Sequence, residues 1–334
     1  PGGTAGATPS PGAVRMTPGL AGVRAVVVSW NSGGLVGRAA ASVPAPARVV
    51  VVDNASADGS ADEARQAGAV VVRLPENSGF GPACNLGAGA VDGLPPAQAF
   101  LFLNPDAALV DGEATLGLLL DALDTDPGVG AVAPALEGDG QGPFQLRRLP
   151  TLGSLAREAF LVNRLFPGNR GFLRERYLDR DRSVPFDVEQ PAAAALLVRR
   201  DVFEKVGGFD PVFAPAWFED VDLCAKILES GYRIRFVPAA RASHVGGTTM
   251  RALPYDDYLP LYTRNLLLYL RRRAGPATRA GARAVLFLGA LLRLALLPLV
   301  RGDHARPEAA RAYARVLRGL LGLGFASALL PRRA

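Results

Sequence analysis

The alternation of β-branched runs with helical stretches in the first third of the chain constrains the fold more than any other feature. Four runs have the character of buried strands, at residues 23–30, 48–54, 69–74 and 99–103, and helical stretches lie between them. Units of about 25 residues with this alternation predict a mainly parallel sheet with helices on both faces. Ligands of such sheets bind beyond the carboxyl ends of the strands.

Polar side chains stand where these strands end. Ser29 and Trp30 end the first strand, Asp53 ends the second, and Asp106 follows the fourth. We therefore expect them along one edge of the sheet, at a crevice. A carboxylate is rarely buried without a partner, so Asp106 predicts a neighbouring cation, either an arginine or a metal ion. Asp53 also has a structural interpretation, because the Asn, Asp, Ser and Gly residues around it all favour turns.

Two further stretches concern helix starts. The sequence ENSGFGPACNLGAGA sets Gly79 and Gly81 before a predicted helix, where close backbone approach and the helix N-terminus can hold phosphate. It lacks the third glycine of a dinucleotide-binding fingerprint and follows the third strand rather than the first, which argues against an NAD site. Ser60 and Glu63 have capping-box spacing and predict the start of a short helix.

The stretch WFEDVDLCAKILESGY carries three carboxylates at a predicted helix start: Glu219, Asp220 and Asp222. The structural interpretation is strong, because the helix dipole favours acids at this end. However, Asp220 borders the apolar side of the helix, which should be covered by the core. Asp222 lies about 200° around the helix from the side chain of Asp220. We expect it to meet a backbone group or an arginine instead.

His244 is one of two histidines in the chain and follows the predicted strand RIRFVP. A lone histidine is more often structural than a ligand. Paired with Asp106, it could complete a nitrogen and oxygen set for a divalent ion.

The net charge of +6 is unevenly distributed. From Arg264 to the end, fourteen arginines face two acids, a net charge of +12, so residues 1–263 sum to −6. A nucleic-acid-binding protein as a whole is therefore not indicated. On charge alone, the basic end suits an anionic membrane surface or nucleic acid equally well. The two cysteines suggest no disulfide framework.

Residues 284–300 are strongly apolar, but Arg293 interrupts the run and Pro298 ends it. This is marginal for a transmembrane helix, which takes about 20 apolar residues. The surrounding arginines suit a helix that lies among lipid headgroups. The alternative is a terminal helical hairpin packed on the domain. The first 22 residues are rich in Gly, Pro and Ala and are expected to be a disordered tail, and residues 138–190 have no readable pattern.

Seven stretches, in this order, resemble the family 2 glycosyltransferases, most closely the bacterial rhamnosyltransferase-like branch: VVVSWNSGG, VVVDNASADGS, ENSGFGPACNLG, FLFLNPDA, VGGFDPVF, FEDVDLCAKILESGYRIRFVP and ASHVGG. The resemblance covers about residues 23–270. It implies a GT-A fold with a nucleotide-binding half over 23–136 and an acceptor and catalytic half over 191–250. The remaining residues, 271–334, would form a basic amphipathic helical region.

The resemblance also implies roles for single residues. Asp220 matches the catalytic base, and Asp106 with His244 matches the metal site, in which Asn104 replaces the first acid of the family's D-x-D motif. Cys84 stands where many members have an arginine. The expected contacts with the nucleotide sugar are six: Ser29, Trp30, Asp53, Gly79, Asn85 and Asn104.

The implied activity is inverting transfer of a sugar from a nucleotide-diphosphate donor to a hydroxyl of a lipid-linked or cell-surface glycan. Such a displacement needs a base for the acceptor proton and a cation, here Mg²⁺ or Mn²⁺, for the leaving diphosphate. Rhamnose is the first candidate sugar, with galactofuranose, mannose and glucose as alternatives. A non-catalytic nucleotide-sugar-binding scaffold is the rival from another class. The expected location is peripheral, on the cytoplasmic side of the cell membrane.

Overall fold

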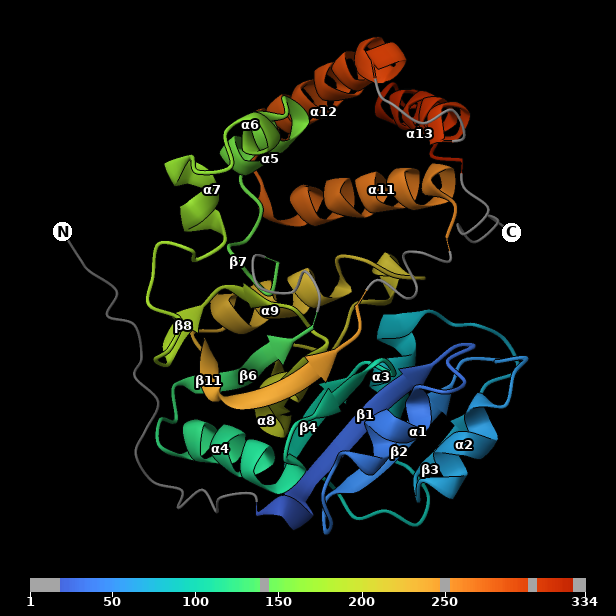
Figure 1. Ribbon diagram of the computed structural model, residues 1–334, viewed down its shortest axis with the longest axis vertical. Helices are drawn as coiled ribbons and strands as arrows, with labels where there is room; N and C mark the ends of the chain where they lie inside the picture. Colours follow the sequence, from blue (N-terminus) through green and yellow to red (C-terminus); the bar gives the residue numbers. More distant parts are fainter. Residues whose placement is uncertain (1–18, 139–143, 247–252, 300–304, 327–334) are drawn as a thin grey trace, which may run out of the picture.

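A computed structural model describes residues 19–138, 144–246, 253–299 and 305–326 of the chain. The molecule consists of a nine-stranded sheet with helices on both faces and a group of C-terminal helices stacked beyond one edge of it (Figure 1). Most of the expected N-terminal tail, residues 1–18, lies outside the described residues.

The first half of the sheet is parallel, as the alternation predicted. Strands β1 (Val23–Ser29), β2 (Arg48–Asp53), β3 (Val70–Arg73) and β4 (Ala99–Leu103) lie in the order β3-β2-β1-β4. Every residue of β1 and β4 is buried, which explains why these strands are continuous apolar runs rather than alternating ones. Three helices connect them: α1 (Val36–Ala41), α2 (Ser60–Gln66) and α3 (Phe80–Ala88).

The second half makes the sheet mixed, where the sequence predicted a mainly parallel one. Strand β10 (Ala195–Arg199) is antiparallel to both β4 and β6 (Val129–Glu137). After β6 the chain stays beyond the carboxyl edge of the sheet and re-enters from there, so β10 runs in the opposite direction; a parallel strand would need a crossover back to the other end. The last strand, β11 (Arg233–His244), pairs with β6, β5 (Ala107–Leu109) and β8 (Phe186–Val188).

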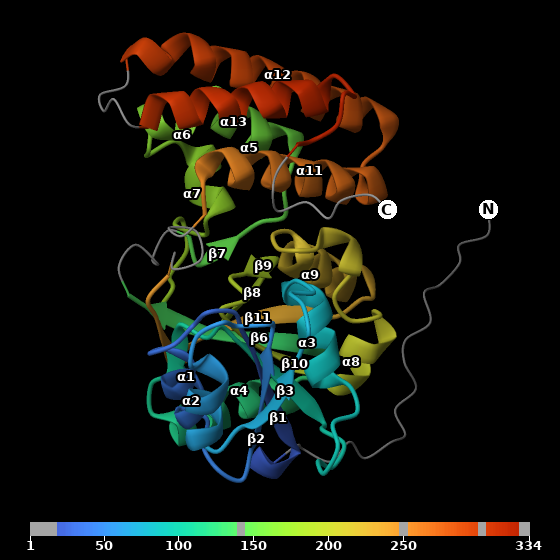
Figure 2. The same ribbon diagram turned by 90° about the vertical axis from the view of Figure 1, so that its right-hand side faces the viewer.

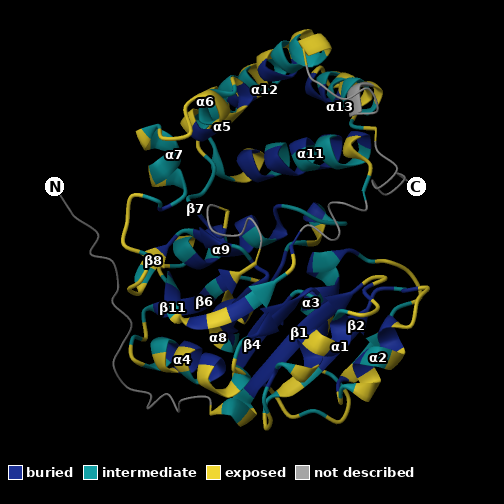
Figure 3. Ribbon diagram, viewed as in Figure 1, coloured by how far each residue is buried: buried dark blue, intermediate teal, exposed yellow. Residues whose placement is uncertain are grey.

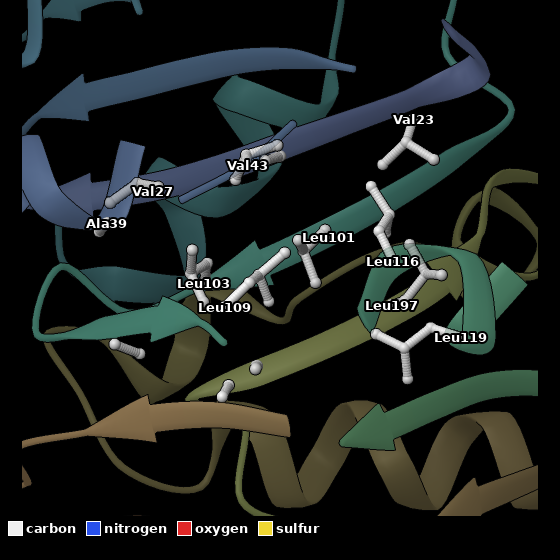
Figure 4. Packing of buried hydrophobic residues seen from close by; sticks show 14 of the residues in the cluster. Val23, Val27, Ala39, Val43, Leu101, Leu103, Leu109, Leu116, Leu119 and Leu197 are labelled. Atoms are coloured by element: carbon white, nitrogen blue, oxygen red, sulfur yellow. The ribbon is translucent and has the colours of Figure 1, made fainter. Parts of the chain in front are cut away.

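The core has two layers, one on each face of the sheet. On one face, Leu116 and Leu119 of α4 (Gly112–Asp124) pack against Leu101 and Leu197 from neighbouring strands (Figure 4). The other face is covered by α3, α8 (Arg200–Lys205) and α9 (Glu219–Glu229). Helices on both faces are therefore confirmed.

The C-terminal helices are α11 (Tyr255–Arg273), α12 (Pro276–Leu296) and α13 (Ala305–Leu320). They lie with α5 (Leu152–Ala159) at the end of the molecule away from β2, and the two views agree on this stacking (Figures 1 and 2). The expected border at residue 270 falls inside α11. The shorter elements are η1 (Leu20–Gly22), β7 (Leu146–Arg147), α6 (Val162–Leu165), α7 (Arg170–Glu175), β9 (Gln190–Pro191), η2 (Pro211–Phe213) and η3 (Leu297–Leu299).

Helix α12 continued by η3, Pro276–Leu299, is the one helix in the described part of the chain that is long and apolar enough to cross a membrane. Length and composition alone support this, and only 17% of its apolar stretch is buried. It also packs against α5 and α13, as the hairpin alternative expected. Figure 3 shows its outer side as exposed or half-buried.

Candidate active site

A cavity of about 620 Å³ opens at the carboxyl edge of the sheet, where the sequence predicted a crevice. Five of the predicted site residues line it together: Trp30, Asn104, Asp106, Asp220 and His244. They come from the ends of β1, β4 and β11 and from the first turn of α9. The fold thus gathers residues that are up to 214 positions apart in the sequence into one lining.

Asp106 and His244 contact each other in this cavity. Antiparallel pairing of β11 with β5 sets His244 opposite Ala107, so the imidazole Nε2 lies 3.2 Å from Asp106 Oδ1. Asp106 is buried, with 7% of its surface exposed. Because the described residues contain no group of three or more His, Cys, Asp or Glu side chains that could hold a metal, an ion at this pair would need further oxygen ligands. Mg²⁺ commonly takes such ligands from water and substrate phosphates, so the donor set fits a divalent ion shared with a diphosphate.

Ser29 and Asp53 lie side by side at the ends of β1 and β2, where they are register partners. Both are fully buried. Asp53 Oδ1 accepts from the Ser56 N–H at 3.2 Å, and Arg73 Nε lies 3.2 Å from Oδ2 without hydrogen-bond alignment. Ser29 Oγ and Asp53 Oδ2 are therefore buried polar atoms without a hydrogen-bond partner among the described residues. Neither residue lines the cavity itself, so the structure does not place these two predicted nucleotide contacts in it.

Gly79 and Asn85 do not line the cavity either. Gly79 has φ +90°, and a Cβ there would lie 2.8 Å from the Pro215 carbonyl oxygen, so only glycine fits. The Asn85 side chain donates to the Phe209 carbonyl at 2.7 Å and accepts from the Phe209 N–H at 2.9 Å. Both residues hold α3 against the loop that precedes α9, so each has a structural role in the fold.

Asp220 is the second residue of α9, and the two residues before this helix are aromatic and have left-handed backbone. Trp217 has φ 71° and Phe218 φ 74°, a conformation that costs on the order of 1–3 kcal/mol per non-glycine residue and recurs at functional sites. The apolar side of α9 that Asp220 borders is buried, as expected. Asp220 Oδ2 accepts a hydrogen bond from Gln190 Nε2 at 3.2 Å, which orients the carboxylate.

The three carboxylates of α9 have different surroundings. Burial raises the pKa of Asp220, and the charge of Arg147 acts in the opposite direction. Burial and the neighbouring Asp220 raise the pKa of Glu219 well above its usual range. Asp222 is turned away and paired with Arg273 at 2.7 Å and Lys226 at 3.4 Å, in agreement with the expected arginine partner.

Sequence reasoning missed the residue that supports this turn. Asn265 of α11 is fully buried, and its Nδ2 donates to the carbonyl oxygens of Phe213, Ala216 and Trp217 at 2.8–2.9 Å. The only signal was an amide inside the apolar run RNLLLYL.

Arg147 was also missed, because it lies in the unreadable segment 138–190. It borders the cavity and also a second one of about 480 Å³, which meets the first at Arg147, Trp217 and Asp220. Asp220 therefore lies at the junction of the two cavities.

Comparison with known proteins identifies the family of the chain. The model of the family described as glycosyl transferase family 2 matches residues 25–207, just over half of the chain. The chain is 32% identical over 212 residues to N-acetylglucosaminyl-diphospho-decaprenol L-rhamnosyltransferase of Mycobacterium tuberculosis, a match that covers 60% of this chain and 66% of that protein. It is 39% identical over 59 residues to a pre-mycofactocin glycosyltransferase of the same organism, which is 18% of this chain and 12% of that protein. The chain thus spans just under two thirds of the length of the first of these relatives.

Two solved structures share the fold at low sequence identity. The crystal structure of GalNAc-T7 with UDP, GalNAc and Mn²⁺ matches with a TM-score of 0.50 and 16% identity, over 75% of this chain and 50% of that one. The crystal structure of a mycobacterial protein matches with a TM-score of 0.50 and 18% identity, over 80% of both chains.

Proposed function

The chain belongs to glycosyl transferase family 2 and has its GT-A fold, and from this we propose that it transfers a sugar, with inversion, from a nucleotide diphosphate to a lipid-linked acceptor. The observation that carries the proposal is the single cavity that contains Asp220, Asp106 and His244. The likeness to a rhamnosyltransferase supports rhamnose as the sugar and a lipid diphosphate as part of the acceptor.

Asp220 is the proposed base. It takes the proton of the acceptor hydroxyl while that oxygen forms a bond to the anomeric carbon and the bond from this carbon to the diphosphate breaks. A raised pKa makes its carboxylate a stronger base. Burial and the charge of Asp220 raise the pKa of Glu219 beside it, which favours the neutral form of Glu219 next to the base.

The donor side of the cavity holds the nucleotide sugar. Trp30 and Asn104 line it, and Ser29 and Asp53 directly precede the lining residues Trp30 and Asn54 in the chain. Asp106 and His244 would hold Mg²⁺ or Mn²⁺, which when bound stabilises the charge that develops on the leaving diphosphate.

Peripheral contact with the cytoplasmic membrane face is the proposed location. The fourteen arginines overstate the charge available to lipid, because several pair with acids that precede residue 264: Arg272 with Asp210, Arg273 with Asp222, Arg293 with Glu158, Arg311 with Asp256 and Arg315 with Asp257. Exposed apolar side chains at the same end of the molecule support insertion instead. Those of α12 and η3 are Leu288, Leu291 and Leu299.

A screen of nucleotide-diphosphate sugars tests the proposal. We expect release of the nucleotide from the rhamnose donor when a polyprenyl-diphosphate-linked sugar is present as acceptor. Faster release of the nucleotide from a galactofuranose, mannose or glucose donor would show that this sugar, and not rhamnose, is transferred by the proposed reaction. Tight nucleotide binding without release from any donor would instead favour the scaffold alternative.

A further inference from the structure

The second cavity, of about 480 Å³, lies between the start of α9 and the C-terminal helices. Its lining runs from Asp220 and Trp217, where it meets the donor cavity, to Tyr313 and Val316 on α13. One end therefore reaches the proposed base. The other end lies among the helices that carry the exposed leucines.

The arginines that line this cavity differ in whether their N–H groups have hydrogen-bond partners. Arg148 bonds to Glu189 at 2.6 Å, and Arg293 lies 3.4 Å from Glu158. By contrast, Arg147 Nε and Arg176 Nε and Nη1 are buried without a hydrogen-bond partner among the described residues. The contact of Arg176 with Glu175, at 3.9 Å, is too long for a hydrogen bond.

Arg147 and Arg176 also lie close enough to repel each other. Burial and the charge of Arg147 lower the pKa of Arg176. Buried cations with free N–H groups are costly unless an anion joins them. Two guanidinium groups facing one space suit a group with two negative charges, such as a diphosphate.

The walls beyond these arginines are apolar. They are formed by residues of α5, α11, α12 and α13, among them Leu155, Leu259, Leu286, Ala290 and Val316. Four tyrosines of α11 and α13 also line the cavity, Tyr255, Tyr258, Tyr262 and Tyr313, and Glu158 and Glu175 lie at its border. The aliphatic side chains among the lining residues suit a hydrocarbon chain.

We propose that this cavity binds the lipid-diphosphate part of the acceptor. Arg147 and Arg176 hold the diphosphate that joins the acceptor sugar to an isoprenoid, and the first isoprenoid units lie along α11, α12 and α13. The acceptor sugar then extends to Asp220 at the junction with the donor cavity. This inference rests on the proposed function and gives a role to segment 144–190, which supplies both arginines.

Binding of farnesyl diphosphate to the full chain, measured by isothermal titration calorimetry, tests the subsite without any sugar transfer. Arg176→Gln should weaken binding about 10- to 100-fold, the loss expected for hydrogen bonds to a charged group. Arg176→Lys should restore part of the affinity. The matched control is Arg174→Gln, because Arg174 is exposed on α7, two residues before Arg176, and lines neither cavity.

Three results would overturn the inference: equal affinity of Arg176→Gln and wild type, displacement of farnesyl diphosphate by a saturating nucleoside diphosphate, or equally tight binding of inorganic diphosphate. The last would show that the apolar walls contribute nothing. Transfer assays separate this inference from the proposed function. Normal transfer by Arg176→Gln with an unchanged KM for the lipid-linked acceptor refutes the subsite alone. Failure of transfer with every donor, alongside binding that depends on Arg176, refutes the function alone.

Discussion

Replacing Asp220 by asparagine is the sharpest test of the site, because Asp222 provides a matched control two residues away. Asp220→Asn keeps the shape of the side chain and an oxygen for Gln190, but it removes the basic carboxylate. Loss of a general base lowers turnover by a factor on the order of 10²–10⁴. Nucleotide affinity should stay nearly unchanged, because the base acts on the acceptor hydroxyl.

Asp222→Asn should have the opposite profile. Its carboxylate has 1% of its surface exposed and is paired with Arg273 and Lys226. Removing one partner of a buried pair costs about 3–5 kcal/mol, and the lower end applies here because Arg273 keeps Glu229 at 2.8 Å. The variant should therefore melt several degrees lower, while turnover per folded molecule stays close to wild type.

The assay measures kcat, nucleotide affinity and the melting temperature of both variants. Near-normal kcat in Asp220→Asn with a large loss in Asp222→Asn would place the base two residues further on. Full activity of both would refute catalysis by a carboxylate of α9. A melting temperature of Asp220→Asn far below that of Asp222→Asn would refute the division between a catalytic and a structural carboxylate.

Four further predictions concern the same regions. Asp106→Asn should remove most activity and weaken nucleotide binding, and full activity in excess EDTA would contradict a metal at this site. Burial and Asp220 raise the pKa of Glu219 in the folded state, so Glu219 gives up its proton more readily in the unfolded state and stability falls as pH rises above the unfolded pKa. Glu219→Gln should therefore melt higher than wild type at pH 8, and this difference in melting temperature should close toward pH 4. Asn265→Leu leaves three carbonyl oxygens without their donor, so we expect about 1–3 kcal/mol less stability and a lower kcat, and an unchanged kcat would show that the turn needs no clamp. Leu288→Ser combined with Leu291→Ser should weaken pelleting with anionic vesicles about tenfold, since each side chain is roughly half exposed, and equal pelleting would rule out this face.

Local patterns predicted the strands well, because a strand buried on both faces needs a continuous apolar run whatever surrounds it. These patterns failed where a side chain bonds to a segment that is distant in the sequence. Ser60 and Glu63 have capping-box spacing, yet α2 is capped by neither: Ser60 bonds to Asp58, and the Glu63 carboxylate accepts from the N–H groups of Gly34 and Gly37. Spacing along the chain cannot reveal that a neighbouring loop competes for the same carboxylate.

Some residues of the candidate site could likewise be predicted from the sequence, and others could not. Residues at strand ends could be predicted, because topology alone brings Trp30, Asn104 and Asp106 to one edge. Arg147 could not, since a strand of two residues has no recognisable pattern and its partner β9 lies more than forty residues later. The free charge of the tail could not be predicted for a related reason: acids that pair with its arginines lie outside the tail.

Helix α11 contacts both the turn before the proposed base and the second cavity. From its inner side, Asn265 holds the turn before Asp220, and Tyr258 and Tyr262 pack edge-on against Trp217 and Phe218, with ring centroids 4.8 and 5.0 Å apart. The same helix lines the second cavity and receives α13 through ion pairs of Asp256 and Asp257. A disturbance of the C-terminal helices therefore reaches the strained turn that carries the base. The helices beyond the matched family region thus support the turn that carries the proposed base, and shortening the chain within α11 should lower kcat even with an acceptor that needs no membrane.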